Sequence, residues 1–91
     1  MLEQKWIIND GNLIIGKVEI HDELHSGKMD RNKTIGGGKW LIDKENNIMY
    51  FYGKSIDYGQ VTKKEFEKSH KQPSIDKYTI YFSLKSSPCK E

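Results

Sequence analysis

The pattern of apolar and polar side chains along the chain predicts five β-strands. It alternates most clearly in residues 13–20 and 78–84, where one of the two sets of alternate positions is mainly apolar, as expected of a strand with one buried face. Shorter apolar runs predict three more strands, over 5–8, 39–43 and 48–52. A shift of one residue would turn the buried face outward, so we expect the alternation to fix the register and, with it, the side chain that follows each strand.

Turn and capping signals connect these strands. Asp10-Gly11 predicts a tight hairpin between the first two strands. Thr62 and Glu65 have the spacing of a capping box, which predicts the start of a helix running over about 63–70. The polar region 22–34 leaves two alternatives, a short helix or a mobile loop.

Together these elements predict one α+β domain over residues 1–91. It consists of an antiparallel or mixed sheet of about five to six strands, with one firm helix and room for a second short helix packed on it. We expect residues 85–91 to form a flexible tail.

Composition narrows the functional classes. The net charge of +2 is spread along the chain and is too low to indicate a nucleic-acid partner. No apolar run approaches the roughly 20 residues that a membrane-spanning helix needs, and the first residues lack the pattern of a signal peptide. The single cysteine, Cys89, excludes an internal disulfide. We therefore expect a cytoplasmic monomer without metal or other cofactor.

Two glycine-rich segments and one histidine are the candidates for function. Residues 36–38 are consecutive glycines, and residues 53–59 are bracketed by glycines with Ser55 between them. Backbone amides in such turns can form an anion-binding concavity. His21 follows the strand over 13–20 directly, so the three segments predict a phosphate-sized pocket with a histidine at its lip.

Plainer interpretations of the same residues stay open. A histidine after a strand is more often structural than catalytic, and the glycines can form a bulge at a strand start. Ser55 can satisfy its own loop as a turn former. His25 and His70 have no supporting context, and both are expected on the surface.

The order of the motifs resembles the Janus/Ocnus family of protein-histidine phosphatases. The likeness extends over roughly residues 5–85. Its most specific part is the glycine triplet followed, further along, by tyrosine-glycine-x-serine-x-x-tyrosine-glycine. The matching segments are Lys5 in the first strand, Ile20-His21-Asp22, Gly36-Gly37-Gly38 followed by Lys39, Tyr52 to Gly59, and Tyr78-Thr79-Ile80 in the final strand.

The resemblance implies a site for a phosphoryl group. His21 matches the family's essential histidine and would be the catalytic residue. The groups that would bind phosphate are Lys5, Lys39, Ser55, Gly38 and the backbone amides around Asp22 and Asp57. Three departures weaken the expected affinity for phosphate. Lys39 stands where the family often has arginine, no arginine lies near Asn12, and Asp57 replaces a small residue.

The implied reaction is metal-independent hydrolysis of phosphohistidine or a related phosphoramidate. The substrate would be a phosphohistidine-containing protein or a small phosphoramidate. His21 would act as a general base or as a nucleophile, because an imidazole titrates near neutral pH. The alternative is a catalytically weak phosphate- or phosphoprotein-binding module of the same fold. An interaction domain that uses the sheet face, with Tyr81 and Trp40 among its residues, ranks last.

Overall fold

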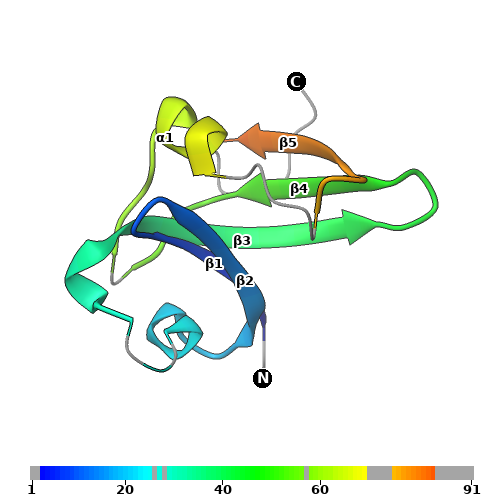
Figure 1. The fold of residues 1–91 in the computed structure, drawn as a ribbon. Helices are drawn as coiled ribbons and strands as arrows, with labels where there is room; N and C mark the ends of the chain where they lie inside the picture. The colour runs from blue at the N-terminus through cyan, green and yellow to red at the C-terminus, as the bar shows by residue number, and fades with distance from the viewer. Residues whose placement is uncertain (1–2, 26, 28, 57, 70–74, 84–91) are drawn as a thin grey trace.

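A mixed five-stranded sheet forms the centre of the fold, with strand order β2-β1-β3-β4-β5 (Figure 1). It is seen in a computed structural model that describes residues 3–25, 27, 29–56, 58–69 and 75–83. The strands are β1 (Glu3–Asn9), β2 (Asn12–Val18), β3 (Thr34–Asp43), β4 (Ile48–Tyr52) and β5 (Thr79–Ser83). All neighbours are antiparallel except β4 and β5, which are parallel. The α+β prediction is therefore confirmed with five strands, and a sixth does not occur in the described ranges.

Local sequence signals account for the connections. Asp10 and Gly11 both have positive φ, 51° and 76°, as a two-residue hairpin turn between right-twisted strands requires. Parallel strands need a crossover, and the one between β4 and β5 contains α1 (Lys63–Ser69). The predicted capping box is present: the Thr62 amide donates to Glu65 Oε1 at 2.9 Å, and the Glu65 amide donates to Thr62 Oγ1 at 3.1 Å.

One face of the sheet carries the hydrophobic core under α1. Trp6 of β1 and Phe51 of β4 are fully buried there, together with Phe66 of the helix. The Phe66 ring stacks on Phe82 at 4.4 Å between centroids and meets Trp6 edge-on at 5.4 Å. This aromatic cluster attaches the helix to the sheet.

The opposite face is covered by a polar segment between β2 and β3. It contains two 3-10 helices, η1 (His21–Leu24) and η2 (Arg31–Lys33), and η1 packs on β1 and β2. In Figure 1, α1 and η1 lie on opposite sides of the sheet. The sequence left a short helix or a mobile loop open for residues 22–34, and a short helix is present over residues 21–24. Residues 26 and 28 lie outside the described part.

Among the strand boundaries that differ from the prediction, two change the interpretation of the candidate site. β3 begins at Thr34 instead of residue 39, so residues 36–38 lie inside a central strand and do not form a turn before it. β2 ends at Val18 instead of residue 20. His21 is therefore the first residue of η1, and the expectation that the sheet register fixes its side chain is wrong. A 3-10 turn fixes it instead.

Close packing explains why the central strand contains glycines. A Cβ at Gly37 would lie 2.2 Å from the Trp6 carbonyl oxygen, and one at Gly38 would lie 2.3 Å from the Tyr52 carbonyl oxygen. Both distances are far below van der Waals contact, and both atoms belong to the backbone of a neighbouring strand. These positions accept no other side chain without moving β1 or β4.

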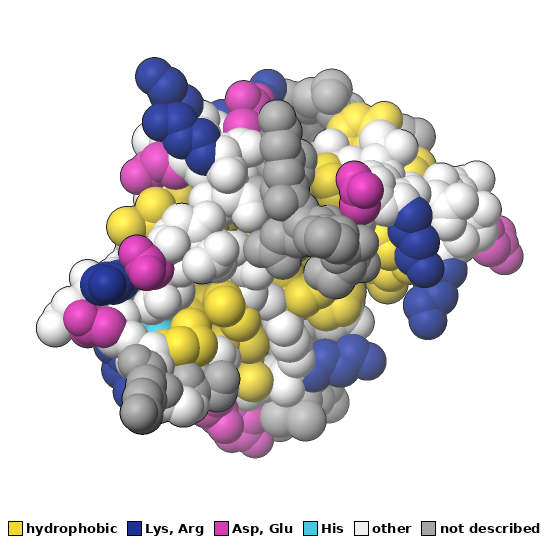
Figure 2. All heavy atoms as spheres, in the orientation of Figure 1, with side chains coloured by type: hydrophobic (Ala, Val, Ile, Leu, Met, Phe, Trp, Pro, Cys, Tyr) yellow, Lys and Arg dark blue, Asp and Glu magenta, His cyan; other side chains and the backbone are white. Residues whose placement is uncertain are grey.

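On the face seen in Figure 2, basic and acidic side chains are interspersed. No helix of the described residues is long and apolar enough to cross a membrane. Predictions for His70, for Asp57 and for the 85–91 tail fall outside the described residues.

Substitution of two glycines separates packing from backbone conformation. We expect Gly37→Ala to lower the free energy of unfolding by about 3 kcal/mol or more, because the methyl group overlaps the Trp6 carbonyl. Gly53 meets nothing within 4 Å but has φ +77°, so Gly53→Ala should cost only about 1–2 kcal/mol. Urea unfolding of both variants measures the difference, and equal losses would contradict this explanation.

Candidate functional site

Three segments that are distant in sequence meet on the polar face of the sheet. They are η1, the glycines of β3, and the loop 53–59, of which residue 57 lies outside the described part. Reciprocal backbone bonds between Ser55 and Gly59, at 3.0 and 2.8 Å, close the loop. The Gly37 amide donates to the Gly59 carbonyl at 3.1 Å and attaches the loop to β3. The predicted convergence of the two glycine segments with the histidine segment is therefore present.

A hydrogen bond docks His21 on the glycine strand. Its side chain is buried, with 7% of the residue exposed, and Nε2 lies 2.7 Å from the Gly38 carbonyl oxygen. A carbonyl only accepts, so Nε2 carries the proton and donates. In the neutral imidazole Nδ1 then holds the lone pair, and Nδ1 is the nitrogen that can act as a base or a nucleophile.

The glycine at position 37 makes room for this imidazole. A Cβ there would lie 3.1 Å from His21 Cδ2 as well as overlapping the Trp6 carbonyl. The Gly37 amide is engaged by Gly59. The expectation that the glycines offer their amides to an anion is therefore wrong for Gly37, whose role is to admit the ring and support the loop.

The two predicted cations have different surroundings. Lys5 is buried on β1 and its Nζ donates to the Glu19 carbonyl, two residues before His21. Lys39 lies directly opposite on β3, and its Nζ forms an ion pair with Glu3 at 3.0 Å. That pair lowers the pKa of the Glu3 carboxyl. Lys5 thus contacts the segment that leads to His21, whereas Lys39 is paired with an acidic side chain of β1.

Ser55 has the role of a turn former in this structure. The residue is only 1% exposed, and its Oγ accepts a hydrogen bond from the Tyr58 amide at 3.1 Å. A hydroxyl can still donate its proton while it accepts. Contact between Ser55 and a phosphate stays a prediction.

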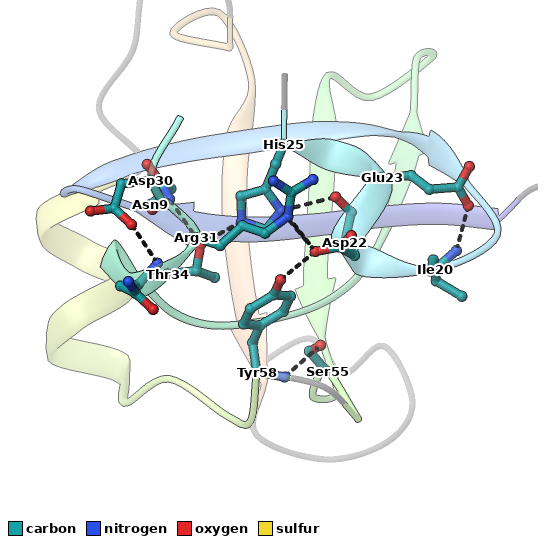
Figure 3. Close-up of polar contacts among 11 residues, drawn as sticks. Asn9, Ile20, Asp22, Glu23, His25, Asp30, Arg31, Thr34, Ser55 and Tyr58 are labelled. Carbon is teal, nitrogen blue, oxygen red and sulfur yellow. Dashed lines mark hydrogen bonds and ion pairs between the residues drawn. The ribbon is translucent and has the colours of Figure 1, made fainter. Parts of the chain in front are cut away.

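The Asp22 side chain connects η1 to the serine loop and to η2. One carboxylate oxygen accepts from the Tyr58 hydroxyl at 2.6 Å and from Arg31 Nε at 2.7 Å, as Figure 3 shows. The hydrogen bond from Tyr58, followed by that from Arg31, holds the pKa of the Asp22 carboxyl below its ordinary value. The residue after His21 is therefore tied both to the serine loop and to η2.

His25 was expected on the surface, and that expectation is wrong. The residue is buried, its Nδ1 lies 2.9 Å from the Asp22 carbonyl oxygen, and its Nε2 lies 2.6 Å from Thr34 Oγ1. Asn9 Nδ2 donates to the same threonine oxygen at 2.9 Å. The three-residue spacing of Asp22 and His25, one 3-10 turn, is the only local signal for this network, because Asn9 and Thr34 join it through the fold.

Comparison with protein-family models, with curated proteins and with solved structures found no match to the chain. In the part of the chain that the structure describes, no three His, Cys, Asp or Glu side chains are grouped so that they could hold a metal ion.

The hydrogen-bond partners predict opposite tautomers for the two buried histidines. Neutral His21 should carry its proton on Nε2, because Gly38 offers a carbonyl there. Neutral His25 should carry it on Nδ1, which faces the Asp22 carbonyl. Long-range proton–nitrogen correlation spectra above pH 8 distinguish the two forms. A His21 spectrum of the Nδ1-protonated form would contradict the docking described here.

The Asp22 carboxylate should make stability depend on pH. Its pKa in the folded protein lies below the ordinary 3.8, so its contribution is present above that value and is lost as the pH falls through the lowered pKa. Asp22→Asn should be less stable than the parent at pH 7, and the difference should shrink at pH 3. Urea unfolding at both pH values tests this, with the exposed Asp76→Asn as the control expected to stay within about 0.5 kcal/mol. A gap that is unchanged at pH 3 would exclude the carboxylate's charge as the cause.

Proposed function

We propose that the protein is a phosphohistidine phosphatase of the Janus/Ocnus type, which hydrolyses phosphohistidine or a related phosphoramidate with His21 as the reactive residue. One observation carries the proposal. The His21 imidazole is held by Nε2 against Gly38, on the face of β3 where the serine loop meets η1. The same three segments carry the motifs of the family resemblance.

The reaction needs little more than correct positioning of the substrate and the attacking water, and groups that neutralise the charge on the phosphoryl oxygens. The P–N bond of the substrate breaks, a P–O bond to water forms, and the leaving imidazole nitrogen takes up a proton. With Nε2 bonded to a carbonyl, Nδ1 of His21 would take one of two roles. It either accepts a proton from the attacking water or attacks phosphorus itself, in which case water then cleaves the new Nδ1–P bond.

Several neighbouring groups would neutralise the phosphoryl oxygens. Lys5 would exchange the Glu19 carbonyl for a phosphate oxygen, and Ser55 would donate its hydroxyl proton while it keeps the Tyr58 amide as a donor. Binding by Gly38 and by the amides around Asp22 and Asp57 remains part of the proposal. A low-dielectric, partly closed site would strengthen each of these contacts.

A second candidate is a phosphate-binding module with weak turnover. It is favoured by the ion pair between Lys39 and Glu3 at 3.0 Å and by the burial of Ser55. Both groups would have to give up a present partner or position before they reached an anion. Binding of phosphate without release from a phosphohistidine peptide would support this candidate over the enzyme.

The sheet-face interaction domain has less support. The Trp40 indole donates to the Lys5 carbonyl at 3.1 Å, so its nitrogen is engaged within the sheet. The Tyr81 ring stacks on Tyr50. A monomeric state, a cytoplasmic location and the absence of a nucleic-acid partner stay predictions.

Phosphate release from a phosphohistidine peptide tests the enzyme directly. We expect His21→Ala to lower kcat by at least about 100-fold, the usual size of a lost acid–base group. Its unfolding curve should be compared with that of the parent, so that a folding defect is recognised. An undiminished rate in folded His21→Ala would remove this residue from the mechanism.

Two lysines of one hollow provide a matched test of the cation. Lys39 and Lys17 both line a hollow of about 290 Å³. If Lys39 binds phosphate, Lys39→Gln should weaken inorganic phosphate binding by about tenfold, which corresponds to about 1.4 kcal/mol. Lys17→Gln should change it less than about twofold. If both substitutions weakened phosphate binding equally, Lys39 would contribute only general positive charge and would not bind phosphate directly.

A further inference from the structure

We propose that Tyr58 is a positioning residue for His21, and that it acts through the Asp22 carboxylate. This inference rests on the proposed function, because it concerns the placement of the proposed reactive residue. It assigns a purpose to a tyrosine of the serine loop that does not itself have to touch the phosphoryl group.

The turn that carries His21 depends on bonds from outside. η1 is a 3-10 helix of four residues, and so short a helix has little stability of its own. Within the turn, the Ile20 amide donates to Glu23 Oε1 at 3.1 Å, which is an exposed contact. Side chains attach η1 to other elements: His21 bonds to the Gly38 carbonyl of β3, and the Asp22 carboxylate bonds to Tyr58 of the serine loop and to Arg31 of η2.

Tyr58 is bonded at both of its ends to parts of the proposed site. Its amide donates to Ser55 Oγ at 3.1 Å, and its hydroxyl donates to the Asp22 carboxylate at 2.6 Å. Both contacts are drawn in Figure 3. An O–H bond to a carboxylate is among the shorter and stronger hydrogen bonds. One residue therefore sets the spacing between the serine loop and the turn that begins with His21.

Arg31 holds the same carboxylate from the other side. It is the single arginine of the chain, and its Nε lies 2.7 Å from Asp22 Oδ1. Its side chain is 55% exposed, so water screens the Arg31–Asp22 ion pair. The hydrogen bond from the half-buried Tyr58 hydroxyl to Asp22 is less exposed to water. We therefore expect the hydroxyl of Tyr58 to matter more than the guanidinium.

Loss of the hydroxyl should affect turnover more than binding. A small displacement of a reacting group can lower a rate by up to about 100-fold. Tyr58→Phe keeps the ring, which packs 5.2 Å from His25, and removes the hydroxyl that donates to Asp22. We expect kcat to fall about tenfold and KM to change less than about twofold, because Lys5 is held on β1 and Ser55 by its backbone bonds to Gly59, so these two phosphate donors remain in place.

The experiment compares Tyr58→Phe with Tyr50→Phe in the full chain. Tyr50 is a half-buried tyrosine of β4 whose ring stacks on Tyr81 at 5.7 Å, so it controls for the removal of a phenol hydroxyl. Phosphate release from a phosphohistidine peptide gives kcat and KM. Solvent exchange of the His21 Hε2 proton, followed by NMR, reports the docking of the imidazole without any reaction. Arg31→Gln provides a second variant at an exposed position.

The results separate this inference from the proposed function. It is supported if Tyr58→Phe lowers kcat about tenfold and speeds His21 Hε2 exchange at least fivefold, while Tyr50→Phe changes neither and Arg31→Gln has a smaller effect. It is overturned if Tyr58→Phe leaves the exchange rate and kcat as in the parent, even though the parent is active. If the parent itself releases no phosphate, the proposed function fails, and unchanged His21 exchange in Tyr58→Phe and Arg31→Gln would overturn the positioning role as well.

Discussion

The missing side chains at Gly37 and Gly38 are the constraint on which both layers of this fold depend. On one face Gly38 leaves space for the Trp6 indole, since a Cβ would come within 2.9 Å of its Nε1, and that nitrogen donates to the Lys39 carbonyl. On the other face Gly37 leaves space for the His21 ring, which bonds to the Gly38 carbonyl. Adjacent residues of one strand thus admit the core tryptophan above the sheet and the candidate reactive histidine below it.

The two layers are held to the sheet by different forces. Under α1 the contacts are apolar and aromatic, and area burial dominates. Beneath the other face, hydrogen bonds from His25, Thr34 and Asn9 bind the segment between β2 and β3. No fully buried side-chain nitrogen or oxygen of the described residues lacks a partner, as such a network requires. Segments with few apolar contacts open more readily than a hydrophobic core, so the proposed site lies on the more easily opened side of the sheet.

Local chemistry predicted the hairpin at Asp10-Gly11, the capping box at Thr62 and most of the strands, because each depends on residues close in sequence. The prediction for the glycines was wrong, because a glycine run usually breaks a strand. Only the close approach of β1 and β4 explains why residues 36–38 lie inside β3. The convergence of His21 with the serine loop was anticipated from the order of the motifs. The hydrogen bonds that hold these segments together were not anticipated, because the Tyr58–Asp22 contact joins residues 36 positions apart. The burial of His25 was not anticipated either, because it depends on partners from two strands.

The position of a bound anion would show whether His21, Lys5 and Ser55 surround one phosphate site. Crystals of the full chain soaked with tungstate, a tetrahedral anion with a strong anomalous signal, would locate the site without an assay. The proposed phosphate site predicts one dominant peak within hydrogen-bonding distance of His21 Nδ1, with Lys5 and Ser55 around it. A dominant peak in the hollow between Lys17 and Lys39, or no ordered peak near His21 at saturating tungstate, would contradict it.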